Sequence, residues 1–134
     1  MSAEAIVAGA RACLGTRFRP QGRMPGLGLD CLGLVDAALA QAGQPIDFPR
    51  DYSLRGDALA ARAEVGLAAA GGVRVRVARP GDVLLFEPVS GQAHLAIASD
   101  RGVIQAHLGV GRVVEGPADP AWPVRSAWRF VVGE

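Results

Sequence analysis

The sequence predicts an α+β fold in which N-terminal helices pack on one face of a mostly antiparallel sheet of five to six strands. Helix-forming segments occupy the chain up to about residue 70, and short apolar or alternating segments typical of strands follow them. A length of 134 residues fits a single domain, 1–134, that buries roughly two-thirds of its unfolded surface.

The composition excludes several classes of function. Half of the residues are hydrophobic, a fifth are charged, and the formal net charge is +1. The basic residues are all arginines, and they are scattered along the chain, so no nucleic-acid footprint is expected. No apolar run is long enough to span a membrane. The N-terminus lacks the basic leader and the long apolar segment of a signal peptide, so no signal peptide is expected.

The first predicted helix covers about residues 3–14, with Ser2 as its N-cap and Gly15 as its end. Cys13 belongs to the apolar stripe of this helix and is expected to be a small buried side chain. Residues 16–28 are rich in proline and glycine, which predicts a loop. A loop of this length is expected to form part of a site, with a mobile surface excursion as the alternative.

A glycine-rich loop then leads into the helix that the chain is organised around. Asp30 is a suitable N-cap, and Gly43 suits the left-handed residue that ends a helix. The residues between them form an apolar stripe at helical spacing: Leu34, Val35, Ala38, Leu39 and Ala42.

Cys31 occupies the first turn of this helix, where the helix dipole stabilises a thiolate relative to the thiol. The acidic N-cap Asp30 opposes that effect, so activation requires a cationic partner, and His94 and His107 are the candidates. A disulfide between Cys13 and Cys31 is a minor alternative, because no export signal is evident.

The remaining elements follow from local patterns. Residues 44–53 form a loop, residues 57–70 favour a helix, and Pro80-Gly81-Asp82 forms a turn. The predicted strands are 73–77, 83–86, 93–99, 103–107, 112–115 and 127–132.

The two histidines flank a predicted hairpin turn, residues 99–102. A two-residue loop at residues 100–101 sets His94 opposite His107, and a loop at residues 101–102 shifts the pairing by two places. Either even-length loop puts both imidazoles on one face of the sheet. A cysteine at a helix start with two such histidines is a set of nucleophile, base and orienting residue.

Four motifs resemble those of the NlpC family of cell-wall cysteine peptidases. Asp-Cys-Leu-Gly-Leu-Val at 30–35 resembles the family's Asp-Cys-Ser-Gly-Leu-Val, and Pro-Gly-Asp-Val-Leu-Leu-Phe at 80–86 resembles its Pro-Gly-Asp-Leu-Val-Phe-Phe. His-Leu-Ala-Ile at 94–97 is similar to its His-Val-Gly-Ile, and 103–107 to its second histidine strand. The motifs occur in the family's order. Residues 16–31 look most like the branch found beside the tail genes of phages and gene transfer agents.

This resemblance implies a papain-like fold and cleavage of peptidoglycan stem peptides, usually at the bond from D-glutamate to diaminopimelate. Cys31 maps to the nucleophile, His94 to the base and His107 to the orienting residue, and no metal or other cofactor is implied. A thioester acyl-enzyme and an oxyanion bound by the backbone N–H of Cys31 are expected. Two residues depart from the family pattern: Phe18 stands where many members have tyrosine, and Leu32 replaces the common serine.

The resemblance to tail-associated members also suggests where the protein acts. We expect a protein made in the cytoplasm, incorporated into a phage-like or gene-transfer-agent tail, and active in the periplasm or cell wall. Residues 117–123 are a candidate docking surface, with Trp122 folded back on the core as the alternative. Three other readings stay open: a zinc site at the same three residues, a structural tail component with little activity, and an amidase or acyltransferase.

Overall fold

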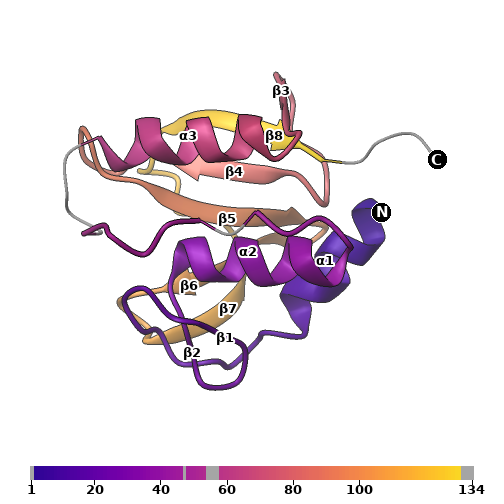
Figure 1. The fold of residues 1–134 in the computed structure, drawn as a ribbon, viewed down its shortest axis with the longest axis vertical. Helices are drawn as coiled ribbons and strands as arrows, with labels where there is room; N and C mark the ends of the chain where they lie inside the picture. Colours follow the sequence, from indigo (N-terminus) through magenta and orange to yellow (C-terminus); the bar gives the residue numbers. More distant parts are fainter. Residues whose placement is uncertain (1, 47, 54–57, 131–134) are drawn as a thin grey trace.

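The computed structural model describes residues 2–46, 48–53 and 58–130. Within these residues, three helices lie against a six-stranded sheet whose neighbouring strands are antiparallel, so the predicted α+β class is confirmed (Figure 1). The helices are α1 (Ala3–Arg11), α2 (Cys31–Gln41) and α3 (Leu59–Ala69). In spatial order, the strands are β3 (Val73–Val75), β8 (Val124–Arg129), β4 (Val83–Phe86), β5 (His94–Ser99), β6 (Gly102–His107) and β7 (Arg112–Gly116).

The segment predicted as a loop before α2 contains a small hairpin. Strand β1 (Arg23–Met24) pairs with β2 (Gly28–Leu29) in an antiparallel ladder. The backbone N–H of Phe18 donates to the carbonyl of Gly111, which ties the segment to the turn between β6 and β7. The prediction of a loop is therefore wrong in part, because residues 23–24 and 28–29 form paired strands and backbone hydrogen bonds hold this segment against the sheet.

Several predicted boundaries shift. Ser2 caps α1 by accepting from the N–H of Ala5, but the helix ends at Arg11, three residues before the predicted end. Strand β3 ends at Val75, two residues early, and β8 begins at Val124, three residues before its predicted start. Residue 57 of the predicted third helix and residues 131–132 of the predicted last strand lie outside the described residues.

The two faces of the sheet carry different layers. One face packs under the helices, and its core includes Leu95, Ile97 and Ile104 against residues of α2 such as Leu34 and Leu39. Figure 1 shows α2 lying along β5. The other face carries a smaller apolar cluster, which is covered by Ala118 and Trp122 from the β7–β8 connection: Leu84, Phe86, Ala96, Ala98, Val103 and Ala127.

Both cysteines are buried and free, so the alternative of a disulfide is excluded. Cys13 is fully buried, as predicted, and its thiol lies 3.5 Å from the carbonyl oxygen of Gly9. None of the described helices combines the length and the apolar character that crossing a membrane requires.

Candidate active site

Cys31 is the first residue of α2, as the sequence predicts. The Asp30 carboxylate accepts the N–H of Gly33 at 2.8 Å, which is the hydrogen bond expected of an N-cap. Only 1% of Cys31 is exposed. The residue lines a cavity of about 510 Å³, together with Phe18, His94, His107 and Trp122.

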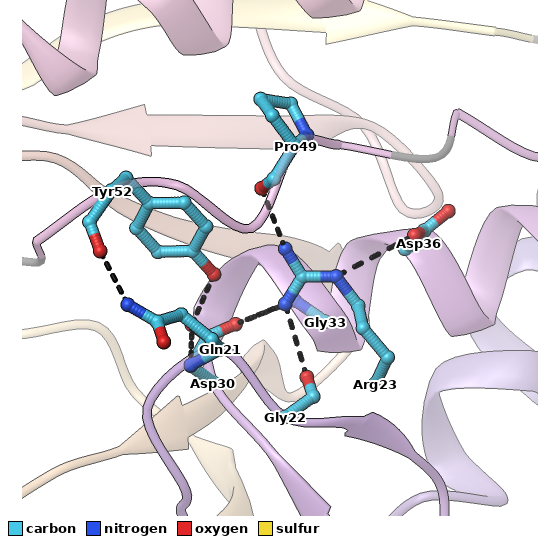
Figure 2. Close-up of polar contacts among 8 residues, drawn as sticks. All are labelled: Gln21, Gly22, Arg23, Asp30, Gly33, Asp36, Pro49 and Tyr52. Carbon is cyan, nitrogen blue, oxygen red and sulfur yellow. Dashed lines mark hydrogen bonds and ion pairs between the residues drawn. The ribbon is translucent and has the colours of Figure 1, made fainter.

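A buried network surrounds the Asp30 carboxylate (Figure 2). It accepts from the N–H of Gln21 at 2.7 Å, from the Tyr52 hydroxyl and from Nη1 of Arg23 at 3.1 Å. Arg23 also donates to the carbonyls of Gly22 and Pro49, and its guanidinium lies 5.5 Å from the centre of the Tyr52 ring. The charge of Asp30 is thus compensated by Arg23, a cation near the nucleophile that was not predicted from the sequence.

Burial is the main influence on the ionisation of Cys31. Burial and, to a smaller extent, the nearby Asp30 charge raise the pKa of the thiol to about 12. The backbone N–H groups of Leu95, Leu32 and Cys31 face the sulfur and lower the pKa by less. The opposing effect predicted for Asp30 is therefore present, burial adds a larger effect of the same sign, and catalysis requires a base that removes the thiol proton.

His94, at the start of β5, is suited to be that base. Its Nε2 lies 2.7 Å from Oε1 of Gln105. An amide oxygen only accepts hydrogen bonds, so Nε2 carries the proton and Nδ1 is left with a free electron pair. Burial lowers the pKa of His94, the Gln105 hydrogen bond opposes this, and the neighbouring His107 lowers the pKa further. The imidazole is therefore neutral at pH 7 and able to accept a proton.

Gln105, and not His107, contacts the second nitrogen of His94. The hairpin register is the first of the two that the sequence left open, with Ser99 opposite Gly102 and Ile97 opposite Ile104. The pairing of β5 with β6 ends at Ile97 and Ile104. Beyond that point, His94 contacts its diagonal neighbour Gln105, which lies on the same face of β6 as His107. Gln105 was not predicted as a site residue, although a polar residue between Ile104 and Ala106 in a predicted strand was a usable signal.

His107 does line the cavity, but its hydrogen bond is local. Its Nδ1 accepts the N–H of Val110 at 3.0 Å. Both histidine rings contact Trp122, with centroids 4.8 Å away for His94 and 6.3 Å away for His107. The two imidazoles therefore share a face of the sheet, as predicted. Trp122 is folded back over them, which is the alternative to an exposed docking tryptophan.

The zinc alternative receives no support from the geometry. Among residues 2–46, 48–53 and 58–130, no three histidine, cysteine, aspartate or glutamate side chains are placed to hold a metal ion. What the arrangement provides is a thiol at a helix start, a neutral imidazole with an oriented proton, and a shared cavity. These are the parts of a cysteine-dependent acyl-transfer site.

Known proteins were compared with the chain by sequence and by structure. No family model matches the sequence, and no curated protein gives a significant match. Solved structures do match. NlpC2 from Trichomonas vaginalis superposes with a TM-score of 0.72 and 20% identity, over 96% of this chain and 46% of that protein, so the chain spans about half of its length.

Two further structures match along nearly their whole length. The NlpC/p60 domain of the peptidoglycan hydrolase SagA has a TM-score of 0.68 and 26% identity, covering 95% of this chain and 97% of that one. RipD from Mycobacterium tuberculosis, described as a non-catalytic NlpC/p60 domain protein adapted to peptidoglycan binding, has a TM-score of 0.64 and 19% identity, covering 96% and 97%. The fold of this chain is therefore the NlpC/p60 fold.

Proposed function

We propose that this protein is a cysteine endopeptidase that hydrolyses peptidoglycan stem peptides. The observation that carries the proposal is the hydrogen bond between His94 and Gln105 beside the cavity that Cys31 lines. A structural histidine needs no free ring nitrogen, whereas this one keeps Nδ1 as a base and has a lowered pKa. The fold similarity to the peptidoglycan hydrolase SagA supports the choice of substrate.

In the mechanism we propose, the thiol proton of Cys31 passes to Nδ1 of His94 as the sulfur attacks the amide carbonyl. The tetrahedral intermediate collapses to a thioester, and the imidazolium gives its proton to the leaving amine. Water, deprotonated by His94, then hydrolyses the thioester and regenerates the thiol. Gln105 holds Nε2–H throughout and so keeps the imidazole in the productive tautomer.

The oxyanion of the tetrahedral intermediate needs hydrogen-bond donors. We assign the backbone N–H of Cys31 as one donor, since it lies at the start of α2. Phe18 lines the same cavity but has no hydroxyl, so it cannot supply the contact that a tyrosine at this position could make. We propose that this protein stabilises the oxyanion mainly through backbone groups.

The finer assignments are also proposals. From the motif resemblance, we propose that the scissile bond joins D-glutamate to diaminopimelate, and that a phage-like tail carries the protein to the cell wall. Fractionation of producing cells and particles tests the second idea. We expect the chain in purified particles, and its complete retention in the cytoplasm would contradict delivery by a tail without affecting the proposed chemistry.

A non-catalytic binding protein is the competing function, because RipD has the same fold and is described as adapted to peptidoglycan binding. The test is incubation of purified peptidoglycan with the wild type and with the Cys31→Ala and His94→Ala variants, followed by mass analysis of released fragments. We expect new amine and carboxyl termini within the stem peptide from the wild type alone. Binding of the wild type to peptidoglycan without released fragments would favour the competing function.

A further inference from the structure

We infer that His107 is a specificity-determining residue that donates a hydrogen bond from Nε2 to a carbonyl oxygen of the bound stem peptide. This inference rests on the proposed function and deepens it. It replaces the orienting role that the sequence suggested for His107, because Gln105 already contacts the second nitrogen of His94.

Three contacts fix the imidazole of His107. Its ring lies close to parallel with the Trp122 indole, at an angle of 18° and a centroid distance of 6.3 Å. The N–H of Val110 donates to Nδ1 at 3.0 Å. Gly109 packs so closely that an added Cβ would lie 3.0 Å from Cε1 and 3.3 Å from Nδ1 of the ring. The β6–β7 turn therefore holds the ring in one orientation at the wall of the cavity.

These contacts also fix where the ring proton lies. Nδ1 accepts the Val110 N–H with its electron pair, so in the neutral imidazole the proton is on Nε2. Among the residues that the structure describes, none is seen to accept a hydrogen bond from Nε2. The result is an oriented N–H donor in the cavity wall.

A single fixed N–H donor of this kind matches an amide carbonyl oxygen of a stem peptide. The surrounding surface favours the same choice, because Leu108 and Val110, on either side of Gly109, are largely exposed and apolar. A fixed donor beside apolar surface recognises an extended peptide backbone through one hydrogen bond and side-chain packing. His107 is thus expected to contribute to substrate binding and not to the proton transfers of Cys31 and His94.

The test measures binding without turnover. In the Cys31→Ala protein, the affinity for a soluble tripeptide of L-alanine, D-glutamate and diaminopimelate is measured by calorimetry, with and without changes at His107. We expect His107→Phe, which keeps a ring against Trp122 but has no donor, to bind about tenfold more weakly. His107→Gln, which restores an N–H donor, should recover most of the affinity. Unchanged affinity in the Phe variant would overturn the inference.

Two further readouts separate this role from a structural or orienting one. In the protein with Cys31 intact, His107→Phe should raise KM and leave kcat largely unchanged, and a fall in kcat at constant KM would contradict the inference. Nitrogen NMR of the wild type should find His107 as the Nε2–H tautomer, and the Nδ1–H tautomer would overturn it. If the Cys31→Ala parent binds no stem peptide, the proposed function itself fails. If the parent binds and its affinity does not change when His107 is replaced, only the inference about His107 fails.

Gly109→Ala supplies a variant that moves the ring without removing it. We expect it to weaken tripeptide binding in the Cys31→Ala background, because its methyl group displaces the imidazole. Gly116→Ala is the matched control, since a Cβ there meets no atom within 4 Å. Equal affinity of the two variants would contradict the claim that the orientation of His107 matters.

Discussion

Replacing Arg23 with alanine tests whether the buried network behind the nucleophile holds this part of the fold. The Arg23 side chain is 7% exposed, and the Asp30 side chain with which it pairs is fully buried. Removing the guanidinium leaves a buried carboxylate without its cation and removes the hydrogen bonds that Arg23 donates to the carbonyls of Gly22 and Pro49. We therefore expect a large loss of stability.

The magnitude follows from what Asp30 retains. Breaking a buried ion pair by deleting one partner costs about 3–5 kcal/mol. Three donors remain on the carboxylate, the N–H groups of Gly33 and Gln21 and the Tyr52 hydroxyl, and they limit the loss. We predict a decrease of about 3 kcal/mol in the free energy of unfolding, at the lower end of that range.

The assay is equilibrium unfolding in urea, followed by circular dichroism. Arg62→Ala is the matched control, because Arg62 pairs with the exposed Asp51 at 2.8 Å and should lose less than about 1 kcal/mol. The double variant Arg23→Ala/Asp30→Asn should recover part of the loss, since it removes the buried charge and retains a good N-cap. A cost for Arg23→Ala no larger than that for Arg62→Ala would refute the reasoning.

Three further predictions concern the site. Because His94 must be neutral to accept a proton and burial lowers its pKa from the ordinary 6.5, the acid limb of kcat/KM should have its midpoint below pH 6.5; a midpoint above pH 7 would argue against His94 as the base. Gln105→Leu should lower kcat/KM by at least about tenfold, whereas Gln105→His should retain more activity, and equal rates for both would exclude an orienting role. Gly33→Ala places a methyl group 2.0 Å from the carbonyl oxygen of Gly22, so urea unfolding should reveal a loss of about 1–3 kcal/mol, compared with little change for Gly116→Ala.

The N-terminal half of the site was predictable because local chemistry determines it. An acidic N-cap followed by an apolar stripe at helical spacing predicts a helix start, and in the structure Asp30 caps the helix that begins at Cys31. The position of the histidines on one face followed from the two-residue hairpin loop, and that register is confirmed. In both cases the structure depends on residues that are close together in the sequence.

The partner of His94 could not be derived in the same way. Strand alternation gives the face on which a side chain lies, but it does not distinguish the residue directly opposite from the diagonal neighbour. Gln105 and His107 share a face, and only the point where the ladder ends selects Gln105. The His107 imidazole is instead held by Val110 in the following turn, a contact that strand patterning does not describe.

The environment of the nucleophile also needed the three-dimensional structure. The position of Cys31 at a helix start was visible in the sequence, but the depth of burial was not, and burial is the largest influence on the pKa of the thiol. The role of Arg23 depends on the β1–β2 hairpin, whose two-residue strands lie within a segment that reads as a loop. Short strands of this kind carry too few residues for their alternation to be recognised.

The measurement that tests the central claim most directly is the intact mass of the protein during turnover. A reaction with soluble stem peptide, quenched in acid within milliseconds to seconds, should contain protein whose mass is increased by the acyl half of the substrate. Peptide mapping should place that adduct on Cys31, and Cys31→Ala should neither form it nor release fragments. Release of fragments by Cys31→Ala, at a rate near that of the wild type, would contradict the assignment of Cys31 as the nucleophile.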